Sequence, residues 1–194
     1  MFSLIIPTFN CKDSIRSFLE SVSKSLLGVD YELLVVDDDS PDGTALEALN
    51  YRSVNPRVKV LVRRKDKGFS SAVITGFTKA SGDLLGVIRP GVDAKLLPDL
   101  VNSTADLAVA SRLFAGLSDR VFSLLSKKLF GLSDFSDFFV VKKSVFDDVK
   151  ESLKFSGDSF LFDFFKAVRL YSVNEVFFLS SGAKFPLGFF KKIF

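Results

Sequence analysis

The chain has 194 residues, of which 26 are Lys or Arg and 23 are Asp or Glu, and its net charge is +3. This balance does not suggest a nucleic-acid-binding protein, and the length suits one domain with a substantial core. The sequence contains no histidine, which excludes histidine acid–base catalysis, Ser–His and Cys–His pairs and histidine-ligated zinc. The single cysteine, Cys11, excludes an internal disulfide and fits a reducing compartment.

Short apolar runs alternate with amphipathic segments through the first half of the chain. We expect strands at Ser3–Ile6, Tyr31–Val36, Val58–Val62 and Leu84–Ile88. We expect helices between them at Asp13–Leu27, Thr44–Tyr51 and Gly68–Ala80, with Asp13 capping the first. This alternation predicts an α/β fold with a mostly parallel sheet and helices on both of its faces.

The second half continues the pattern less regularly. We expect strands at Asp106–Ala110, Phe138–Val141 and Tyr171–Phe178, and helices at Leu117–Phe130, Ser144–Leu153 and Gly157–Val168. Many of the 23 phenylalanines lie in this half, and they either fill a core or form a lipid-facing surface. No apolar run approaches the roughly 20 residues that a membrane span needs.

The last ten residues, Phe185–Phe194, read FPLGFFKKIF. They form either a closing element packed on the domain or a membrane-interfacial segment, with Phe side chains inserted and Lys191 and Lys192 on head groups. We therefore expect one domain over residues 1–184 and a short tail over 185–194. The opening Met1–Asn10 lacks the basic lead-in of a signal peptide, so we expect a cytoplasmic location.

The most informative segment is Leu33–Thr44, LLVVDDDSPDGT, in which a strand-like run stops at three carboxylates, Asp37–Asp39. This places them at the carboxyl end of a strand, where open parallel sheets bind ligands. Adjacent carboxylates repel one another, so such a cluster usually serves hydroxyls, base nitrogens or a cation. The alternative interpretation is a turn and helix start, with Pro41–Gly43 forming the turn.

Several segments in order resemble family 2 glycosyltransferases of the GT-A fold, in particular the dolichyl-phosphate mannose synthases. The most specific are LIIPTFN (Leu4–Asn10), VVDDDSPDGT (Val35–Thr44) and KDKGFSSAVITGFTKASGD (Lys65–Asp83). Weaker matches follow at ASRL (Ala110–Leu113), SDFFVVKKSVF (Ser136–Phe146) and VNEVFF (Val173–Phe178). The resemblance implies a single GT-A domain with a Rossmann-like, mostly parallel sheet.

The resemblance also assigns roles to residues of this chain. The implied nucleotide-sugar site comprises Pro7, Thr8, Phe9, Val36, Asp37, Asp38, Arg89, Gly91 and Arg112. The implied catalytic residues are Asp93 and Arg112, and Arg120 and Lys184 would bind the acceptor phosphate. A guanidinium suits the diphosphate because it can bind phosphate oxygens in pairs. The alternative for Arg112 and Arg120 is an ordinary surface charge.

The family's D-x-D motif, whose carboxylates hold Mg²⁺ or Mn²⁺ against the donor diphosphate, is altered here. Arg89 and Gly91 stand at the two carboxylate positions, and Asp93 remains as a weak metal ligand. One carboxylate is a poor site for a hard cation. Either Arg89 replaces the metal as the counter-charge of the diphosphate, or the site is inactive and the fold serves binding or assembly.

The resemblance implies transfer of a hexose, mannose from GDP-mannose, to a polyprenyl phosphate such as dolichyl phosphate, at the cytoplasmic face of a membrane. The acceptor phosphate is already ionised, so no general base is needed. The alternative function is that of a non-catalytic relative that binds a nucleotide, a lipid phosphate or a partner transferase subunit. Asp38→Ala is expected to abolish donor binding and leave the fold intact.

Overall fold

The structure is a computed structural model that describes residues 1–113, 138–153, 160–168 and 171–179. Its strands are β1 (Phe2–Thr8), β2 (Tyr31–Asp37), β3 (Val58–Val62), β4 (Leu84–Val87), β5 (Leu107–Leu113), β6 (Phe139–Lys142) and β7 (Val173–Leu179). Its α-helices are α1 (Lys12–Ser25), α2 (Thr44–Tyr51), α3 (Phe69–Lys79), α4 (Leu97–Val101), α6 (Lys143–Val149) and α7 (Phe160–Val168). The 3₁₀ turns η1 (Ala94–Leu96) and η2 (Lys150–Ser152) precede α4 and follow α6.

The strands form one sheet in the order β3-β2-β1-β4-β6-β5-β7. All neighbouring pairs are parallel except those of β6, which runs antiparallel to both β4 and β5. The predicted mostly parallel sheet is therefore confirmed. Because β5 runs in the same direction as β1, β2 and β4, the carboxyl ends of these four strands lie at the same edge of the sheet.

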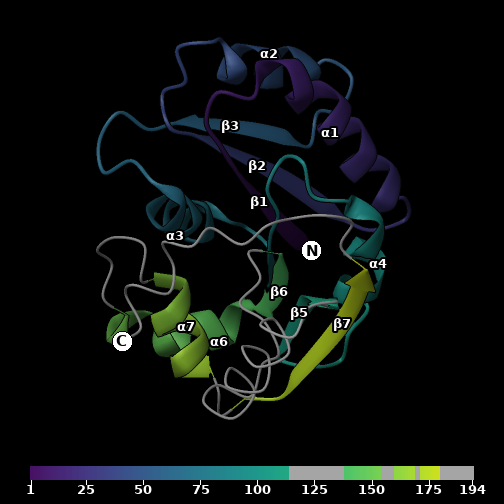
Figure 1. The fold of residues 1–194 in the computed structure, drawn as a ribbon, viewed down its shortest axis with the longest axis vertical. Coiled ribbons are helices and arrows are strands. Elements are labelled where there is room, and N and C mark those ends of the chain that lie inside the picture. The colour runs from purple at the N-terminus through teal and green to yellow at the C-terminus, as the bar shows by residue number, and fades with distance from the viewer. Residues whose placement is uncertain (114–137, 154–159, 169–170, 180–194) are drawn as a thin grey trace.

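Helices cover both faces of the sheet, as the alternation of elements predicts (Figure 1). One core packs α1, α2 and α4 against a face that includes Leu4 and Leu33. The other core packs α3, α6 and α7 against the opposite face, which includes Ile5 and Leu34. Successive strand residues point to opposite faces, so a strand buried on both faces must be continuously apolar.

The helix α3 approaches β1 unusually closely at Gly76. A Cβ atom added there would lie 2.5 Å from both Cγ1 and Cγ2 of Ile5, which is too short for any stable contact. The close approach therefore requires a residue without a side chain, although glycine weakens a helix interior.

The phenylalanines of the second half lie in the core wherever the structure describes their side chains. Phe139 contacts Phe77, Phe164 and Phe165, with ring centroids 6.3, 5.5 and 5.4 Å away. Phe77 also meets Phe146 edge-on at 4.9 Å. Tilted and edge-on pairs at these distances add favourable quadrupole contacts to the burial of apolar area. For these rings the core interpretation is correct, and the lipid-facing one is wrong.

The first helix begins differently from the prediction. Asp13 is not its cap: α1 starts at Lys12, after Cys11, and no side chain of the preceding residue caps it. The backbone N–H of Lys12 instead donates to Asp42 at 3.0 Å, from the loop before α2. A long-range contact thus replaces the local cap. The expected helix Leu117–Phe130 and the tail 185–194 lie outside the described residues, and within the described ranges no helix is both long and apolar enough to cross a bilayer.

Asp106 directly precedes β5, and its hydrogen bonds connect this strand with the end of β6 and the start of β7. Its carboxylate accepts from Lys142 Nζ at 2.8 Å and from Ser172 Oγ at 2.7 Å. The hydrogen bond from Lys142 is the largest cause, and those from Ser172 the next, that lower the pKa of Asp106 to about 2.

We predict that Gly76→Ala lowers the free energy of unfolding by about 1–2 kcal/mol, because overpacking outweighs the gain in helix propensity. Urea unfolding measures this loss. The matched test is a double-mutant cycle with Ile5→Ala, which removes the two atoms that a Cβ at Gly76 would strike. The two substitutions should compensate each other in part, and strict additivity would contradict the close-packing explanation.

We predict that Asp106 stabilises the fold above pH 4 and that this contribution disappears as the pH falls to about 2. The sign follows because the pKa is lower in the folded chain than the usual value of about 3.9 in the unfolded chain. Unfolding free energies of the wild type and Asp106→Asn, measured from pH 2 to pH 6, should differ most at the upper end. Parallel profiles would show that Asp106 contributes nothing.

Candidate active site

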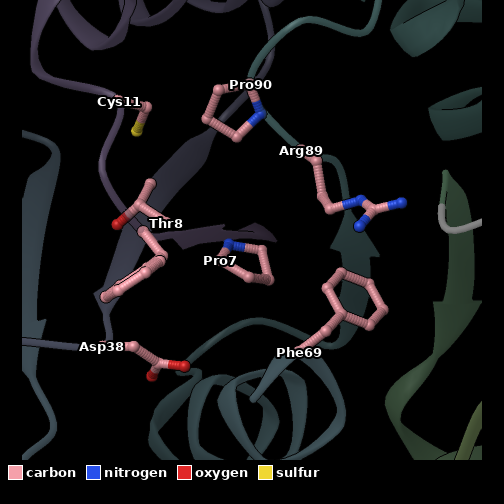
Figure 2. A pocket seen from close by; sticks show the side chains of 8 residues that line it. Pro7, Thr8, Cys11, Asp38, Phe69, Arg89 and Pro90 are labelled. Carbon is pink, nitrogen blue, oxygen red and sulfur yellow. The ribbon is translucent and has the colours of Figure 1, made fainter. Parts of the chain in front are cut away.

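An open cleft of about 310 Å³ lies at the carboxyl edge of the sheet. Its lining residues are Pro7, Thr8, Phe9, Cys11, Asp38, Phe69, Arg89 and Pro90. They come from the end of β1 and the loop after it, from the residue after β2, from the first residue of α3 and from the turn after β4. Figure 2 shows Arg89 and Phe69 on one side of the cleft and Thr8 and Asp38 on the other.

The position of this cleft follows from the topology. The central strand β1 pairs with β2 on one side and with β4 on the other, so the chain reverses its direction of winding beside β1. The loop after β1 leads to α1 on one face of the sheet, whereas α3 covers the opposite face, and the cleft lies between the loop after β1, the start of α3 and the turn after β4. In open α/β sheets, ligands bind at this point.

The three consecutive carboxylates do not act as one cluster, and only Asp38 lines the cleft. Asp37 is fully buried and accepts from Thr8 Oγ1 at 3.0 Å and from the N–H of Ser40 at 2.8 Å. Asp39 lies on the surface and pairs with Lys67 at 3.3 Å. Each carboxylate has its own partners, which relieves the repulsion expected from the sequence.

Asp38 links the cleft to the loop between β3 and α3. One carboxylate oxygen pairs with the guanidinium of Arg63, and the other accepts from the N–H of Gly68 at 2.6 Å. Arg63 also donates to Ser71 Oγ at 2.9 Å and to the carbonyl of Asp66 at 3.1 Å. The side chains of Asp38 and Arg63 are only 11% and 9% exposed, so their charges must neutralise each other.

The remaining lining residues are mainly flat and apolar. Phe9 is 58% exposed at the cleft, although it is one of the larger apolar residues of the chain. Phe69, Pro7 and Pro90 add further flat surfaces. An exposed aromatic ring that stacks on a planar ligand removes apolar surface from water, which is favourable. These residues therefore suit a heterocyclic base.

Arg89 is held over the ring of Phe69, with the guanidinium carbon 4.8 Å from the ring centroid. A guanidinium at this distance is attracted by the negative face of the ring. Because Phe69 opens α3 and Arg89 follows β4, this contact joins the two elements on one side of the cleft.

The described residues at the cleft do not offer the ligands that a divalent metal prefers. Asp93 lies outside the cleft lining with its side chain 62% exposed, and its carboxylate accepts from the N–H of Lys95 and pairs with Lys95 Nζ at 3.4 Å. It thus caps η1. In the described part of the chain, no group of three or more His, Cys, Asp or Glu residues could hold an ion. Mg²⁺ and Mn²⁺ prefer several oxygen ligands, which this set does not offer.

The other predicted site residues are placed as follows. Val36 is buried in the core beneath the cleft, and Gly91 lies in the turn after Pro90 with a φ of +93°. Arg112 belongs to β5 near its carboxyl end, opposite Phe178 of β7. Arg120 and Lys184 lie outside the described residues.

Three lining residues were not assigned to the site from the sequence: Cys11, Phe69 and Pro90. Burial is the main cause that raises the pKa of the Cys11 thiol, with Asp42 and Asp37 adding to it and a hydrogen bond with Thr44 opposing it. The thiol therefore stays protonated and is a poor nucleophile. Pro90 lies between the predicted site residues Arg89 and Gly91, and Phe69 lies within the family segment Lys65–Asp83. These positions were the only indication available from the sequence for the two residues.

The sequence model of "Glycosyl transferase family 2" matches residues 3–177. The chain belongs to glycosyl transferase family 2. The resemblance drawn from the motifs is thereby confirmed, and the sheet with its flanking helices is a GT-A fold.

Among members of glycosyl transferase family 2, the chain is similar to two dolichol-phosphate mannosyltransferases. That of Pyrococcus furiosus is 42% identical over 120 residues, which are 59% of this chain and 34% of the relative. That of Saccharomyces cerevisiae is 30% identical over 128 residues, which are 63% of this chain and 43% of the relative. The matches thus span less than half the length of either relative.

The fold is also that of a crystal structure of glucosyl-3-phosphoglycerate synthase from Mycobacterium tuberculosis, in complex with Mn²⁺, UDP and phosphoglyceric acid. The TM-score is 0.70 at 20% identity, over 98% of this chain and 73% of that chain.

We predict that Asp38→Ala lowers the free energy of unfolding by about 3 kcal/mol, because it leaves the buried Arg63 charge without its partner. The expectation that this variant leaves the fold intact is therefore revised. The neighbouring Asp39→Asn is the control, since asparagine tolerates the left-handed backbone of Asp39 (φ of +59°) and Lys67 and Asp39 are 43% and 48% exposed. It should change the stability by less than about 0.5 kcal/mol. Equal urea midpoints for the two variants would contradict the structural role of Asp38.

Proposed function

We propose that this chain transfers a hexose, mannose from GDP-mannose, to a polyprenyl phosphate such as dolichyl phosphate. The observation that carries the proposal is the cleft at the ends of β1, β2 and β4, where Pro7, Thr8, Phe9, Asp38 and Phe69 come from the segments that carry the family resemblance. The names of the two relatives from Pyrococcus and yeast support the choice of sugar and acceptor.

The cleft offers each part of a nucleotide-sugar donor a suitable partner. Phe9 and Pro7 give flat apolar surfaces for the base. Thr8 and Asp38 offer hydrogen-bonding oxygens for the base edge or the ribose, since a carboxylate oxygen can accept more than one hydrogen bond. Arg89 supplies positive charge on the opposite side.

In the proposed step, an oxygen of the acceptor phosphate attacks the anomeric carbon of the hexose. The bond from that carbon to the donor phosphate breaks, and its electron pair leaves with the nucleoside diphosphate, which inverts the anomeric centre. The attacking oxygen is already ionised, so the chain needs no general base and no histidine. Its contribution is to position the reactants and to stabilise charge on the leaving group.

We assign the remaining charges as part of the proposal. Arg112, at the edge of the sheet where the cleft opens, is proposed to face the diphosphate. Arg120 and Lys184 are proposed to bind the acceptor phosphate. Asp93 is no longer assigned a catalytic or metal-binding role, because it caps η1 and pairs with Lys95.

Because a polyprenyl phosphate is a membrane lipid, we propose that the chain acts at the cytoplasmic face of a membrane as a peripheral protein. The basic and aromatic tail at 185–194 is proposed to contribute to that attachment. The proposal requires no partner subunit.

A second candidate is a non-catalytic member of the family. The observation that favours it is the replacement of both motif carboxylates by Arg89 and Gly91. Such a protein would bind a nucleotide or a lipid phosphate without turnover.

We predict that the purified chain transfers labelled mannose from GDP-mannose to dolichyl phosphate in detergent micelles, with formation of a labelled lipid and GDP. UDP-glucose is the comparison donor. Formation of a glucosyl lipid instead would change the sugar and base but keep the reaction class. Binding of either donor by calorimetry without any labelled product would favour the non-catalytic member.

A further inference from the structure

The turn that follows β4 presents Arg89 to the cleft in a defined conformation. The carbonyl of Arg89 accepts from the N–H of Val92 at 3.2 Å, so residues 89–92 close a β-turn. Pro90 occupies its second position, and Gly91 its third with a φ of +93°. These are the features of a type II turn, in which proline fixes one dihedral and glycine accepts the left-handed one.

This turn explains Gly91 without a ligand role. A side chain at a φ of +93° is strained, so an aspartate at this position would weaken the turn. The segment that carries metal ligands in D-x-D relatives is therefore built here for another geometry. The hydrogen bonds between β4 and β1 continue up to Ile88, whose N–H donates to the carbonyl of Ile5 at 3.1 Å. The turn begins at the next residue, Arg89.

The position of the Arg89 side chain is fixed from a second element. Phe69 holds the guanidinium at 4.8 Å from its ring centroid, and Phe69 itself is fixed by the start of α3. Pro90 also restricts the backbone of Arg89 to extended conformations. A long side chain whose backbone and terminal group are both fixed beforehand loses less conformational entropy when it binds a ligand.

Arg89 is the cationic side chain among the residues that line the cleft. Of the lining residues, only Asp38 and Arg89 are charged, and Asp38 is neutralised by Arg63 behind it. A guanidinium is always protonated and presents paired donors that match two phosphate oxygens. Its charge is present at every physiological pH.

We propose that Arg89, stacked on Phe69 and fixed by the turn at residues 89–92, binds the donor diphosphate in place of a divalent cation. The inference rests on the proposed function, because it concerns the donor of that reaction. In the transfer step, Arg89 stabilises the charge that builds on the departing nucleoside diphosphate. The chain therefore binds its nucleotide without Mg²⁺ or Mn²⁺.

The test is calorimetric titration of GDP, UDP and the nucleosides guanosine and uridine, each with EDTA and with Mn²⁺. The wild type should bind one nucleoside diphosphate equally well in both conditions. Arg89→Ala should weaken that binding about 30-fold, as expected for loss of a charge-assisted pair of hydrogen bonds, and should leave the nucleoside affinity unchanged. Arg89→Lys should recover only part of the loss, because it restores the charge without the planar pair of donors.

The chain offers a matched control in Arg57, which stacks on Tyr31 at 4.9 Å from its ring centroid. This pair lies at the amino ends of β2 and β3, away from the cleft. Arg57→Ala removes the same charge and the same kind of contact, and it should leave diphosphate binding unchanged. An equal loss in Arg57→Ala would show a general charge or folding effect and overturn the proposal.

The outcomes separate the two proposals. Binding of GDP or UDP only in the presence of Mn²⁺ would overturn the role of Arg89 and leave the donor site standing. Unchanged diphosphate binding in Arg89→Ala would do the same. Failure of the wild type to bind either diphosphate in either condition would overturn the proposed function together with the inference.

Discussion

The structure depends on the complete burial of β1. Every residue of Phe2–Thr8 is buried, because other strands pair with both of its edges and helices cover both of its faces. A polar side chain is tolerated in such a buried strand only where it finds a hydrogen-bond partner. At its amino end Ser3 donates to Glu32 at 2.6 Å and accepts from the N–H of Gly82, which closes that end. At its carboxyl end Thr8 donates to Asp37 and lines the cleft together with Asp38, which follows β2.

Local sequence pattern predicted much of this arrangement. Continuous apolar runs are typical of strands buried on both faces, so the strand positions and the parallel sheet could be read directly. The ends of β1 and β2 lie side by side, with Thr8 opposite Asp37, as the order of elements predicts. The presence of Asp38 and Arg89 in the lining follows from the same rule, because residues that end neighbouring parallel strands share an edge.

Long-range contacts set the limit of that prediction. The different fates of Asp37 and Asp38 depend on Ser40 in one case and on Arg63 and Gly68 in the other, and spacing along the chain does not encode those pairings. The start of α1 was misplaced for the same reason, since its first N–H is satisfied by Asp42 from another loop. Phe69 was missed because a helix-start aromatic next to glycine is usually a packing residue, and only the fold brings it beneath Arg89.

The double role of Asp38 has a consequence for the dynamics of the chain. Its carboxylate faces the cleft and also closes the loop at residues 63–68, so the loop can open only if Arg63 and Gly68 release it. A nucleotide that binds to the closed arrangement must therefore shift the opening equilibrium of this loop by mass action. Amide hydrogens at the start of α3 would then exchange with solvent more slowly in the occupied protein. Hydrogen exchange in this loop would therefore depend on whether the cleft is occupied, although most residues of the loop do not line the cleft.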